Sequence, residues 1–219
     1  MKREIQITAD GSSTIHLPDW NENYHSTHGA IQEAKHVFLK HGLAVMSKPN
    51  ISVLEIGFGT GLNCFLTVLA AEQQQVAVDY VGVEAFPVTQ EEVSQLNYIS
   101  ELNAEQHQTV FEQLHAVSWE EKHQINKAFF LEKRQLFFKD IKDVDAFDLI
   151  YFDAFGAEHQ PELWTVAIFK IMFAAMKKQA VLVTYCAKGS VRRAMQEVGF
   201  TVERLEGPPG KREMLRATK

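Results

Sequence analysis

A glycine-rich turn between an apolar strand and an apolar helix constrains this chain more than any other feature. The segment Ile51 to Ile56 is apolar enough for a buried strand, and Leu62 begins a run with helical spacing. Between them stand Gly57, Gly59 and Gly61. Glycines at such a turn let a ligand approach the backbone, and the following helix offers free N–H groups with a partial positive charge. We therefore expect a ligand to bind at this turn.

The spacing of the glycines separates two classes of ligand. Dinucleotide-binding proteins use G-x-G-x-x-G, with the pyrophosphate at the N-terminus of the helix. Here the third glycine comes one residue early, and Leu62 stands where that fingerprint has glycine. The order acid-x-Gly-x-Gly-x-Gly, which begins at Glu55, instead resembles the methyltransferase turn that holds the amino-acid part of S-adenosylmethionine.

Strands and helices alternate along the chain, which predicts an α/β fold with a mostly parallel sheet covered on both faces. Helices are predicted from Leu62 and Pro87, and at Leu163–Met176 and Gly189–Val198. The last two strands are joined by a connection too short for a helical crossover, so they should form an antiparallel hairpin. The predicted strands are Ile51–Ile56, Val78–Glu84, Gln135–Phe138, Phe147–Phe152, Ala180–Tyr185, Thr201–Leu205 and Glu213–Ala217.

The N-terminal residues carry a different pattern. Alternating apolar residues on both sides of Asp10-Gly11 predict a β-hairpin, because this dipeptide adopts the positive φ of a tight turn. A helix with one apolar face is predicted over Gly29–His41. With 219 residues the chain can bury one substantial core. We therefore divide it into an N-terminal hairpin and helix addition, residues 1–45, and a main domain, residues 46–219.

Acidic residues follow the predicted strands at the edge where ligands of such folds bind. Glu84 closes the second strand, where its carboxylate could accept hydrogen bonds from ribose hydroxyls or simply be solvated. Asp140 is placed to bind an adenine amino group, although Asp143 and Asp145 lie close by and all three could be surface charges. Asp153 ends a fully apolar run, so an edge position is favoured over a buried one.

Several segments, in order, resemble the methyltransferase part of the MnmC family, which completes methylaminomethyl-thiouridine at the tRNA wobble position. The likeness runs from about residue 20 to the C-terminus. It implies a class I S-adenosylmethionine-dependent methyltransferase fold with a seven-stranded sheet, S-adenosyl-L-methionine as cofactor, and tRNA as partner. The matching segments are Tyr24-His25-Ser26, Gly29-Ala30, Glu33, His36-Val37-Phe38, Leu54 to Asn63, Asp153-Ala154-Phe155, Pro161, Trp164 and Lys211 to Leu215.

The resemblance and the chemistry of methyl transfer together give a set of candidate site residues. Asp153 and Phe155 are the catalytic candidates: the carboxylate positions an amine, and aromatic rings suit a sulfonium. Trp164, Lys211 and Arg212 are the substrate-binding candidates, the two basic residues through tRNA phosphate. The cofactor-binding candidates are Tyr24, Ser26, Glu33, Glu55, Gly57, Phe58, Gly59, Thr60, Gly61, Asn63, Glu84, Asp140 and Asp153.

Two departures from the family affect the substrate. MnmC proteins also carry a flavin-dependent oxidase domain that exposes the amine, and 219 residues do not accommodate it, so a separate enzyme would have to supply the aminomethyl group. After Asp-Ala-Phe the family continues Ala-Pro, whereas here Gly156 to His159 follow, which leaves the exact substrate open. A small-molecule or protein amine is the alternative substrate, and a nucleotide-binding oxidoreductase or a binding module is the third reading.

Composition sets the remaining expectations. The N-terminus lacks the apolar core of a secretory signal and no apolar run reaches the roughly 20 residues of a membrane span, so we expect a cytoplasmic protein. Cys64 and Cys186 lie in apolar segments and should be unpaired core residues. His25 and His28 lack a third ligand at useful spacing, so no metal is expected. The net charge of −6 argues mildly against a nucleic-acid-coating protein, although the C-terminal stretch is locally basic.

Overall fold

The centre of the molecule is one mixed sheet of eight strands. The computed structural model describes residues 2–219, and the strand order is β10-β11-β9-β8-β4-β5-β7-β6. Neighbours from β9 to β7 run parallel, whereas β6, β11 and β10 run antiparallel to their neighbours. The strands are β4 (Asn50–Ile56), β5 (Ala77–Val83), β6 (Lys122–Gln124), β7 (Phe129–Arg134), β8 (Phe147–Phe152), β9 (Met176–Thr184), β10 (Thr201–Glu206) and β11 (Glu213–Thr218).

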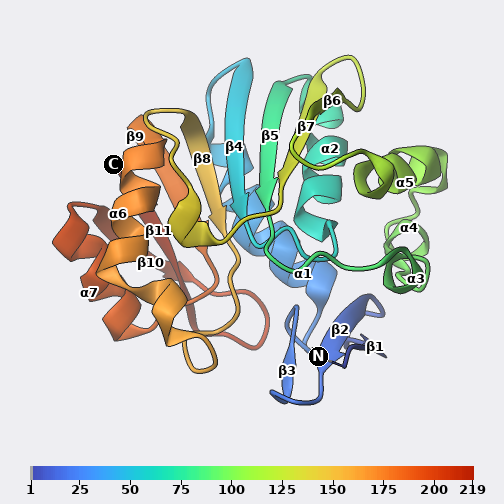
Figure 1. Ribbon diagram of the computed structural model, residues 1–219, viewed down its shortest axis with the longest axis horizontal. Helices are drawn as coiled ribbons and strands as arrows, with labels where there is room; N and C mark the ends of the chain where they lie inside the picture. Colours follow the sequence, from blue (N-terminus) through green and yellow to red (C-terminus); the bar gives the residue numbers. More distant parts are fainter. Residues whose placement is uncertain (1) are drawn as a thin grey trace.

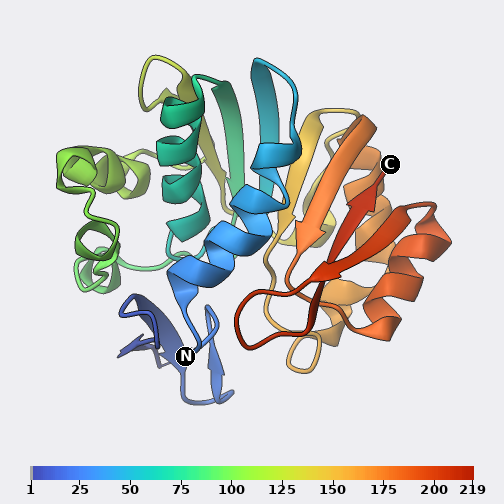
Figure 2. The same ribbon diagram turned by 180° about the vertical axis from the view of Figure 1, so that it is seen from behind.

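Helices cover both faces of this sheet and enclose two apolar cores (Figures 1 and 2). One face carries α1 (Ala30–Ala34), α2 (Leu62–Gln74) and α5 (Gln108–Ala116), and the other carries α6 (Val166–Ala175) and α7 (Gly189–Val198). Strand β8 shows why helices are needed on both faces of the sheet: Leu149 and Tyr151 enter one core, while Ile150 and Phe152 enter the other. Because both faces of the strand are covered, β8 is apolar from Leu149 to Phe152.

The predicted parallel sheet and its C-terminal antiparallel hairpin are confirmed, but the predicted number of seven strands is wrong. The eighth strand, β6, pairs antiparallel with β7 at the edge of the sheet. Its sequence, Lys-His-Gln, is short and polar, so it carries no periodic apolar signal. Edge strands of this kind are commonly short and charged because they leave backbone groups unpaired.

The predicted strand at Gln135–Phe138 is also wrong, because the strand in this part of the chain is β7, which ends at Arg134. Phe129, Leu131 and Lys133 are buried, but the charged run from Glu132 to Arg134 hides this alternation in the sequence. Asp140 consequently belongs to a 3-10 turn, η4 (Phe138–Asp140), and not to the end of a strand. Strand β9 begins at Met176, directly after α6, and is longer than its predicted range.

The segment between β5 and β7 differs from its prediction. Pro87 does not open a helix; the first helix, α3 (Gln90–Val93), begins after Thr89, whose side chain accepts a hydrogen bond from the Glu92 N–H in a capping box. Two short elements, α4 (Tyr98–Glu101) and η3 (Glu105–His107), lead from α3 to α5. Together with α5 they form a helical insert beside α2.

The N-terminal hairpin is confirmed as part of a small antiparallel sheet. It contains β1 (Glu4–Ile7), β2 (Ser13–Leu17) and β3 (Glu22–Asn23), and lies beside the edge to which the parallel strands point (Figure 1). Asn97 of the helical insert joins the two parts: its side chain accepts from the Ser13 N–H and donates to the Gly11 carbonyl. The N-terminal residues are thereby fixed over the carboxyl ends of the strands.

The predicted helix over Gly29–His41 is present but changes type along its length. An α-helical half, α1, continues into a π-helical half, η1 (Lys35–Lys40), and the 3-10 turn η2 (Leu43–Val45) leads to β4. A second 3-10 turn, η5 (Pro161–Trp164), precedes α6, so the predicted helix at Leu163–Met176 starts later than expected.

Candidate active site

The glycine turn between β4 and α2 is shaped by close backbone contacts. The N–H groups of Gly57 and Phe58 both donate to the carbonyl of Val83, at 3.0 Å. Gly57 has φ 89°, and a Cβ there would lie 2.7 Å from the Asp153 carbonyl oxygen. Gly59 has φ 48°, and a Cβ there would lie 3.3 Å from the Tyr24 ring. Side chains at these positions would be strained and would collide with Asp153 or Tyr24, so the turn requires glycine at both.

Glu84 follows β5 and is joined directly to this turn. Its Oε2 accepts a hydrogen bond from the Gly59 N–H at 3.1 Å, and its Oε1 accepts from the Phe86 N–H at 3.0 Å. The carboxylate therefore has a fixed orientation, and each oxygen keeps a further lone pair for a ligand. The role of Glu84 in binding ribose hydroxyls stays a prediction.

Asp153 stands just beyond β8, next to the glycine turn. Its N–H donates to the Ile56 carbonyl at 2.9 Å, and its Oδ2 accepts from Asn63 Nδ2 at 2.8 Å. Burial raises the pKa of the Asp153 carboxyl to about 7, with a further contribution from the negative charge of Glu33, against the lowering effects of Asn63 and Lys211. A carboxyl with this pKa can hold or release a proton near neutral pH.

Unpartnered polar atoms lie beneath Asp153. Asn63 Oδ1 and both carboxyl oxygens of Glu55 are buried without a hydrogen-bond partner among residues 2–219. Burial raises the pKa of the Glu55 carboxyl well above its usual range. Buried polar atoms normally have partners, and these three would be satisfied by a polar group bound at the turn.

The N-terminal sheet supplies aromatic side chains to the same place. The Phe155 ring meets Tyr24 and Trp20 edge to face, with ring centres 5.0 and 5.8 Å apart. His25 contacts Thr60 of the glycine turn, with 3.4 Å between its Nε2 and the hydroxyl oxygen, and burial lowers its pKa to about 4. A neutral His25 therefore fastens the N-terminal addition to the turn.

Glu33 and Lys211 form an ion pair on the other side of Asp153. Glu33 is buried on α1, and its Oε2 accepts a hydrogen bond from the Ser26 N–H at 3.0 Å while its Oε1 pairs with Lys211. Lys211 Nζ lies 3.9 Å from the centre of the Tyr185 ring. That Lys211 binds tRNA phosphate stays a prediction; in this structure its ammonium is paired with Glu33.

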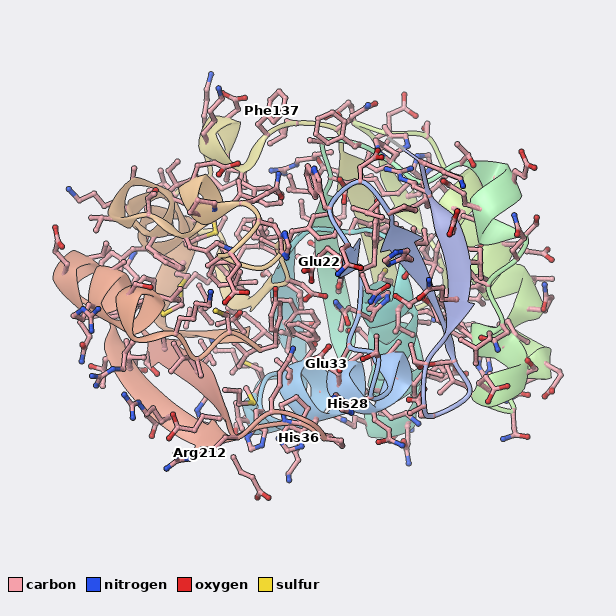
Figure 3. All side chains as sticks on the ribbon, turned by 90° about the horizontal axis from the view of Figure 1, so that it is seen from below. Glu22, His28, Glu33, His36, Phe137 and Arg212 are labelled. Carbon is pink, nitrogen blue, oxygen red and sulfur yellow. The ribbon has the colours of Figure 1, made fainter. Side chains whose placement is uncertain are left out.

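The other predicted substrate residues occupy different positions. Figure 3 looks onto the carboxyl ends of the strands and shows Glu33 near the middle, with Arg212 and His36 on one rim and Phe137 on the opposite rim. Arg212 is exposed, as a phosphate-binding residue requires. Trp164 is only 5% exposed and donates to the Phe155 carbonyl at 2.8 Å, so it supports the loop and is not available for stacking on a base.

Three residues outside the predicted site also lie beside it. Tyr185 follows β9, donates to the Ala154 carbonyl at 2.8 Å, and bears the Lys211 ammonium on its ring. Its position at the end of a predicted strand is the signal that could have found it, as for Glu84. Trp20 carries no such signal, and the sequence brings out His25 only in a family segment and as a rejected metal ligand, because the positions of both depend on how the N-terminal sheet docks. Asp140, in contrast, is exposed and its N–H donates to the Phe137 carbonyl.

Comparison with known proteins gives the family. The S-adenosyl-L-methionine-dependent methyltransferase family matches residues 95–219. The chain belongs to this family. The "tRNA 5-methylaminomethyl-2-thiouridine biosynthesis bifunctional protein MnmC" of an Acidovorax species is 28% identical over 100% of this methyltransferase, which spans 35% of that relative. The protein of the same name from Cupriavidus necator is 30% identical over 90% of the chain, which covers 32% of it.

The fold also matches a solved structure. The methyltransferase superposes on the crystal structure of "MNMC2" from Aquifex aeolicus with a TM-score of 0.80 at 23% identity, covering 99% of this chain and 69% of that one. This likeness shows the fold of the class I methyltransferases, as the sequence predicted. The chain spans about a third of the length of the bifunctional relatives it matches.

The residues at the turn suit the cofactor of the family, S-adenosyl-L-methionine. The unpartnered oxygen of Asn63 can accept from the ammonium group of its amino-acid part, and Glu84 can accept from its ribose hydroxyls. Within residues 2–219 no three His, Cys, Asp or Glu side chains are grouped to hold a metal ion. Cys64 and Cys186 are buried and free, as predicted. None of the helices in the described part of the chain has the length and apolarity to cross a membrane.

Proposed function

We propose that this methyltransferase methylates the primary amine of an aminomethyl group on the wobble uridine of tRNA. The observation that carries the proposal is the carboxyl of Asp153, which Asn63 holds through one oxygen at the mouth of the glycine turn. Its other oxygen has no donor among residues 2–219, so it can accept an N–H of an amine. The names of the relatives, which cover nearly the whole chain, support a uridine of tRNA as the group that bears the amine.

The proposed site divides into residues that hold the cofactor and residues that hold the amine. Asp153 and Phe155 are the proposed catalytic residues, and Arg212 remains a proposed tRNA contact. We assign residues 1–45 as the addition that closes over the site and residues 46–219 as the catalytic domain. The proposed cofactor-binding residues are Tyr24, Ser26, Glu33, Glu55, Gly57, Phe58, Gly59, Thr60, Gly61, Asn63, Glu84, Asp140 and Asp153.

S-adenosyl-L-methionine, when bound, supplies a methyl group on a positively charged sulfur. The chain supplies the rest: an amine can act as a nucleophile only when it is neutral, and Asp153 can accept its proton because the pKa of this carboxyl is about 7. The Asn63 amide fixes the orientation of the carboxylate, which is catalysis by positioning. The Phe155 and Tyr24 rings offer an aromatic wall that suits a cationic group.

A binding assay and a transfer assay test this proposal. Purified protein is incubated with methyl-labelled S-adenosylmethionine and tRNA whose wobble uridine carries an aminomethyl group, and the nucleosides are analysed by mass spectrometry. We expect one added methyl group on that nucleoside and none on tRNA lacking the modification. In a strain without the protein, the aminomethyl nucleoside should accumulate. Labelling of protein or small amines, with tRNA left unchanged, would replace tRNA as the proposed substrate.

A further inference from the structure

The ion pair between Glu33 and Lys211 is placed where it can act on the reacting amine, although neither residue belongs to the core of the fold. Glu33 comes from α1, and Lys211 comes from the loop between β10 and β11, 178 residues away along the chain. Both side chains are largely buried, at 10% and 31% exposure. A largely buried ion pair is costly to desolvate, and so stability alone is a weak explanation for it.

The contacts of the pair lead to Asp153 by two routes. Lys211 lies on the ring of Tyr185, whose hydroxyl holds the carbonyl of Ala154, the residue after Asp153. Through space, the charges of Glu33 and Lys211 act on the Asp153 carboxyl in opposite directions. Other titratable groups are coupled electrostatically to this cluster: Glu55 on β4 and Tyr185 after β9 feel the charge of Asp153, and His25 feels the charges of Glu33 and Lys211. Glu22 acts on Tyr185 and Asp10 acts on His25.

We propose that Glu33 and Lys211 are positioning residues that set the net charge of the pocket in which Asp153 meets the substrate amine. This inference rests on the proposed function. With Asp153 ionised, the three groups carry one net negative charge, which matches the single positive charge of an alkylammonium ion. The proton then passes from the ammonium to the free carboxylate oxygen, leaving a neutral amine and a neutral acid, so charge and atoms balance.

The opposite signs of the two residues explain why both are needed. Without Lys211, Glu33 would add a second unbalanced negative charge, and Asp153 would already hold a proton at neutral pH and could accept none. Without Glu33, the bare ammonium of Lys211 would repel the incoming ammonium ion. The pair therefore selects a substrate that arrives with one positive charge, as an unhindered primary alkylamine does, over a neutral nucleophile such as a hydroxyl.

Charge-removing variants test this arrangement: E33Q, K211M and the double variant E33Q/K211M, with K188M as control. Lys188 forms an exposed ion pair with Glu158, so its loss removes the same charge outside the pocket. The pH dependence of kcat/KM for methyl transfer is measured for each protein. S-adenosylhomocysteine affinity, measured by calorimetry, reports whether the cofactor site is intact.

The two single variants should shift the acid limb of the profile in opposite directions. A unit charge a few ångströms away in a partly buried site changes a pKa by about one unit, so we expect about one pH unit upward for K211M and about one downward for E33Q. The double variant should return close to the wild-type profile, and K188M should not shift it. Equal losses at every pH, or shifts of the same sign, would show a merely structural pair and overturn the proposal.

A measurement without turnover separates this inference from the proposed function. The Asp153 carboxyl is titrated by its carbon-13 chemical shift in the S-adenosylhomocysteine complex of each variant, which needs no tRNA. If the wild-type protein transfers no methyl group to tRNA, the proposed function fails while the opposite shifts of the carboxyl still stand. If K211M does not fold, E33Q is compared with the double variant, and the two differ only in Lys211. The pKa of Asp153 must then be lower in E33Q, which keeps Lys211, than in the double variant.

Discussion

Two aspartates at opposite ends of one strand have opposite environments. Asp148 lies at the start of β8, is 3% exposed, and accepts hydrogen bonds from the Ser52 N–H, Lys48 and Lys177. These donors, against the cost of burial, lower its pKa to about 2. Asp153 follows the end of the same strand, accepts one hydrogen bond from a neutral amide, and has its pKa raised to about 7.

The difference shows that burial alone does not decide what a carboxylate does. Both side chains lose water, which disfavours the charged form, but Asp148 has three donors, whereas Asp153 has one neutral donor and the negative charge of Glu33 nearby. At the amino end of the strand two lysines and a backbone N–H replace the water, so the carboxylate stays ionised and joins β8 to the segments around Lys48, Ser52 and Lys177. At the carboxyl end, a single amide replaces the water lost by Asp153, so this carboxylate remains available as a proton acceptor.

The largest expected effect is on catalysis, from replacing Asp153 by Asn. The substitution keeps the shape and the hydrogen bond to Asn63 but removes the proton acceptor, so we expect methyl transfer to fall by about 10²–10⁴-fold. The affinity for S-adenosylhomocysteine should fall far less than the rate of transfer, because Asn keeps the shape and the contact with Asn63. Steady-state kinetics on aminomethyl-bearing tRNA, with calorimetry of cofactor binding, measure both. Transfer within a few fold of the wild type would remove Asp153 from the mechanism.

The same variant should be more stable than the wild type at alkaline pH. The pKa of Asp153 is raised in the folded state, from an ordinary 3.8 to about 7, so the folded protein holds this proton between those pH values and the unfolded chain does not. Stability therefore falls as pH rises through this window, and Asn removes the loss, by about 2–4 kcal/mol at pH 8. Denaturant unfolding at pH 5 and pH 8 checks the sign.

A second effect at the carboxyl edge concerns the cofactor. Glu84→Gln places an amide N–H₂ opposite the N–H of either Gly59 or Phe86, which both donate to the native carboxylate. Losing one charge-assisted acceptor should weaken S-adenosylhomocysteine binding by about 10–100-fold, equivalent to about 1.4–2.8 kcal/mol. Calorimetry measures it, and Glu91→Gln, on an exposed helix, serves as the matched control. Unchanged affinity in the Glu84 variant would place the ribose elsewhere.

The sequence revealed the carboxyl edge better than it revealed the amino edge. Glu84 and Asp153 could be predicted because an acid directly after an apolar strand is a local signal, and the order of strands then brings them together. Asp148 stands inside the apolar run of β8, where only its partners Lys48 and Lys177 make it tolerable. Those partners come from distant segments, so nothing near Asp148 in the sequence announces them.

The inward turn of Lys211 could not be predicted for the same reason. In sequence it belongs to a basic turn after Gly207-Pro208-Pro209-Gly210, which favours a solvent-facing role beside Arg212. Its direction depends on Glu33, which the N-terminal helix brings to it. The strand at β7 was missed because its core-facing residues include Lys133, whose ammonium donates to the His115 carbonyl at 2.8 Å and lies 5.0 Å from the centre of the Trp119 ring.

At the amino edge the expected effect is on stability and is smaller. Asp148→Asn removes a charge that two lysines and a backbone N–H stabilise, so we expect a loss of about 1–2 kcal/mol at pH 7, reduced because both lysines remain partly exposed. The folded-state pKa is lowered, so the wild-type advantage is present above about pH 4 and disappears as pH falls through about 2. Urea unfolding from pH 2 to pH 7 measures it, and methyl transfer should be unaffected.

The smallest effect should come from Lys48→Met, which tests whether the contrast between the two aspartates depends on the number of donors. Lys48 is 53% exposed, whereas Lys177 is 36% exposed and also donates to the Ser52 hydroxyl. Removing Lys48 leaves Asp148 with Lys177 and the Ser52 N–H, so the loss should stay below about 1 kcal/mol, as for other exposed ion pairs. Denaturant unfolding of this variant is compared with that of Lys177→Met. If Lys48→Met cost as much as Asp148→Asn, the carboxylate would depend on every donor at once. The different charge states of Asp148 and Asp153 would then require a complete set of donors and would not follow gradually from the number of donors.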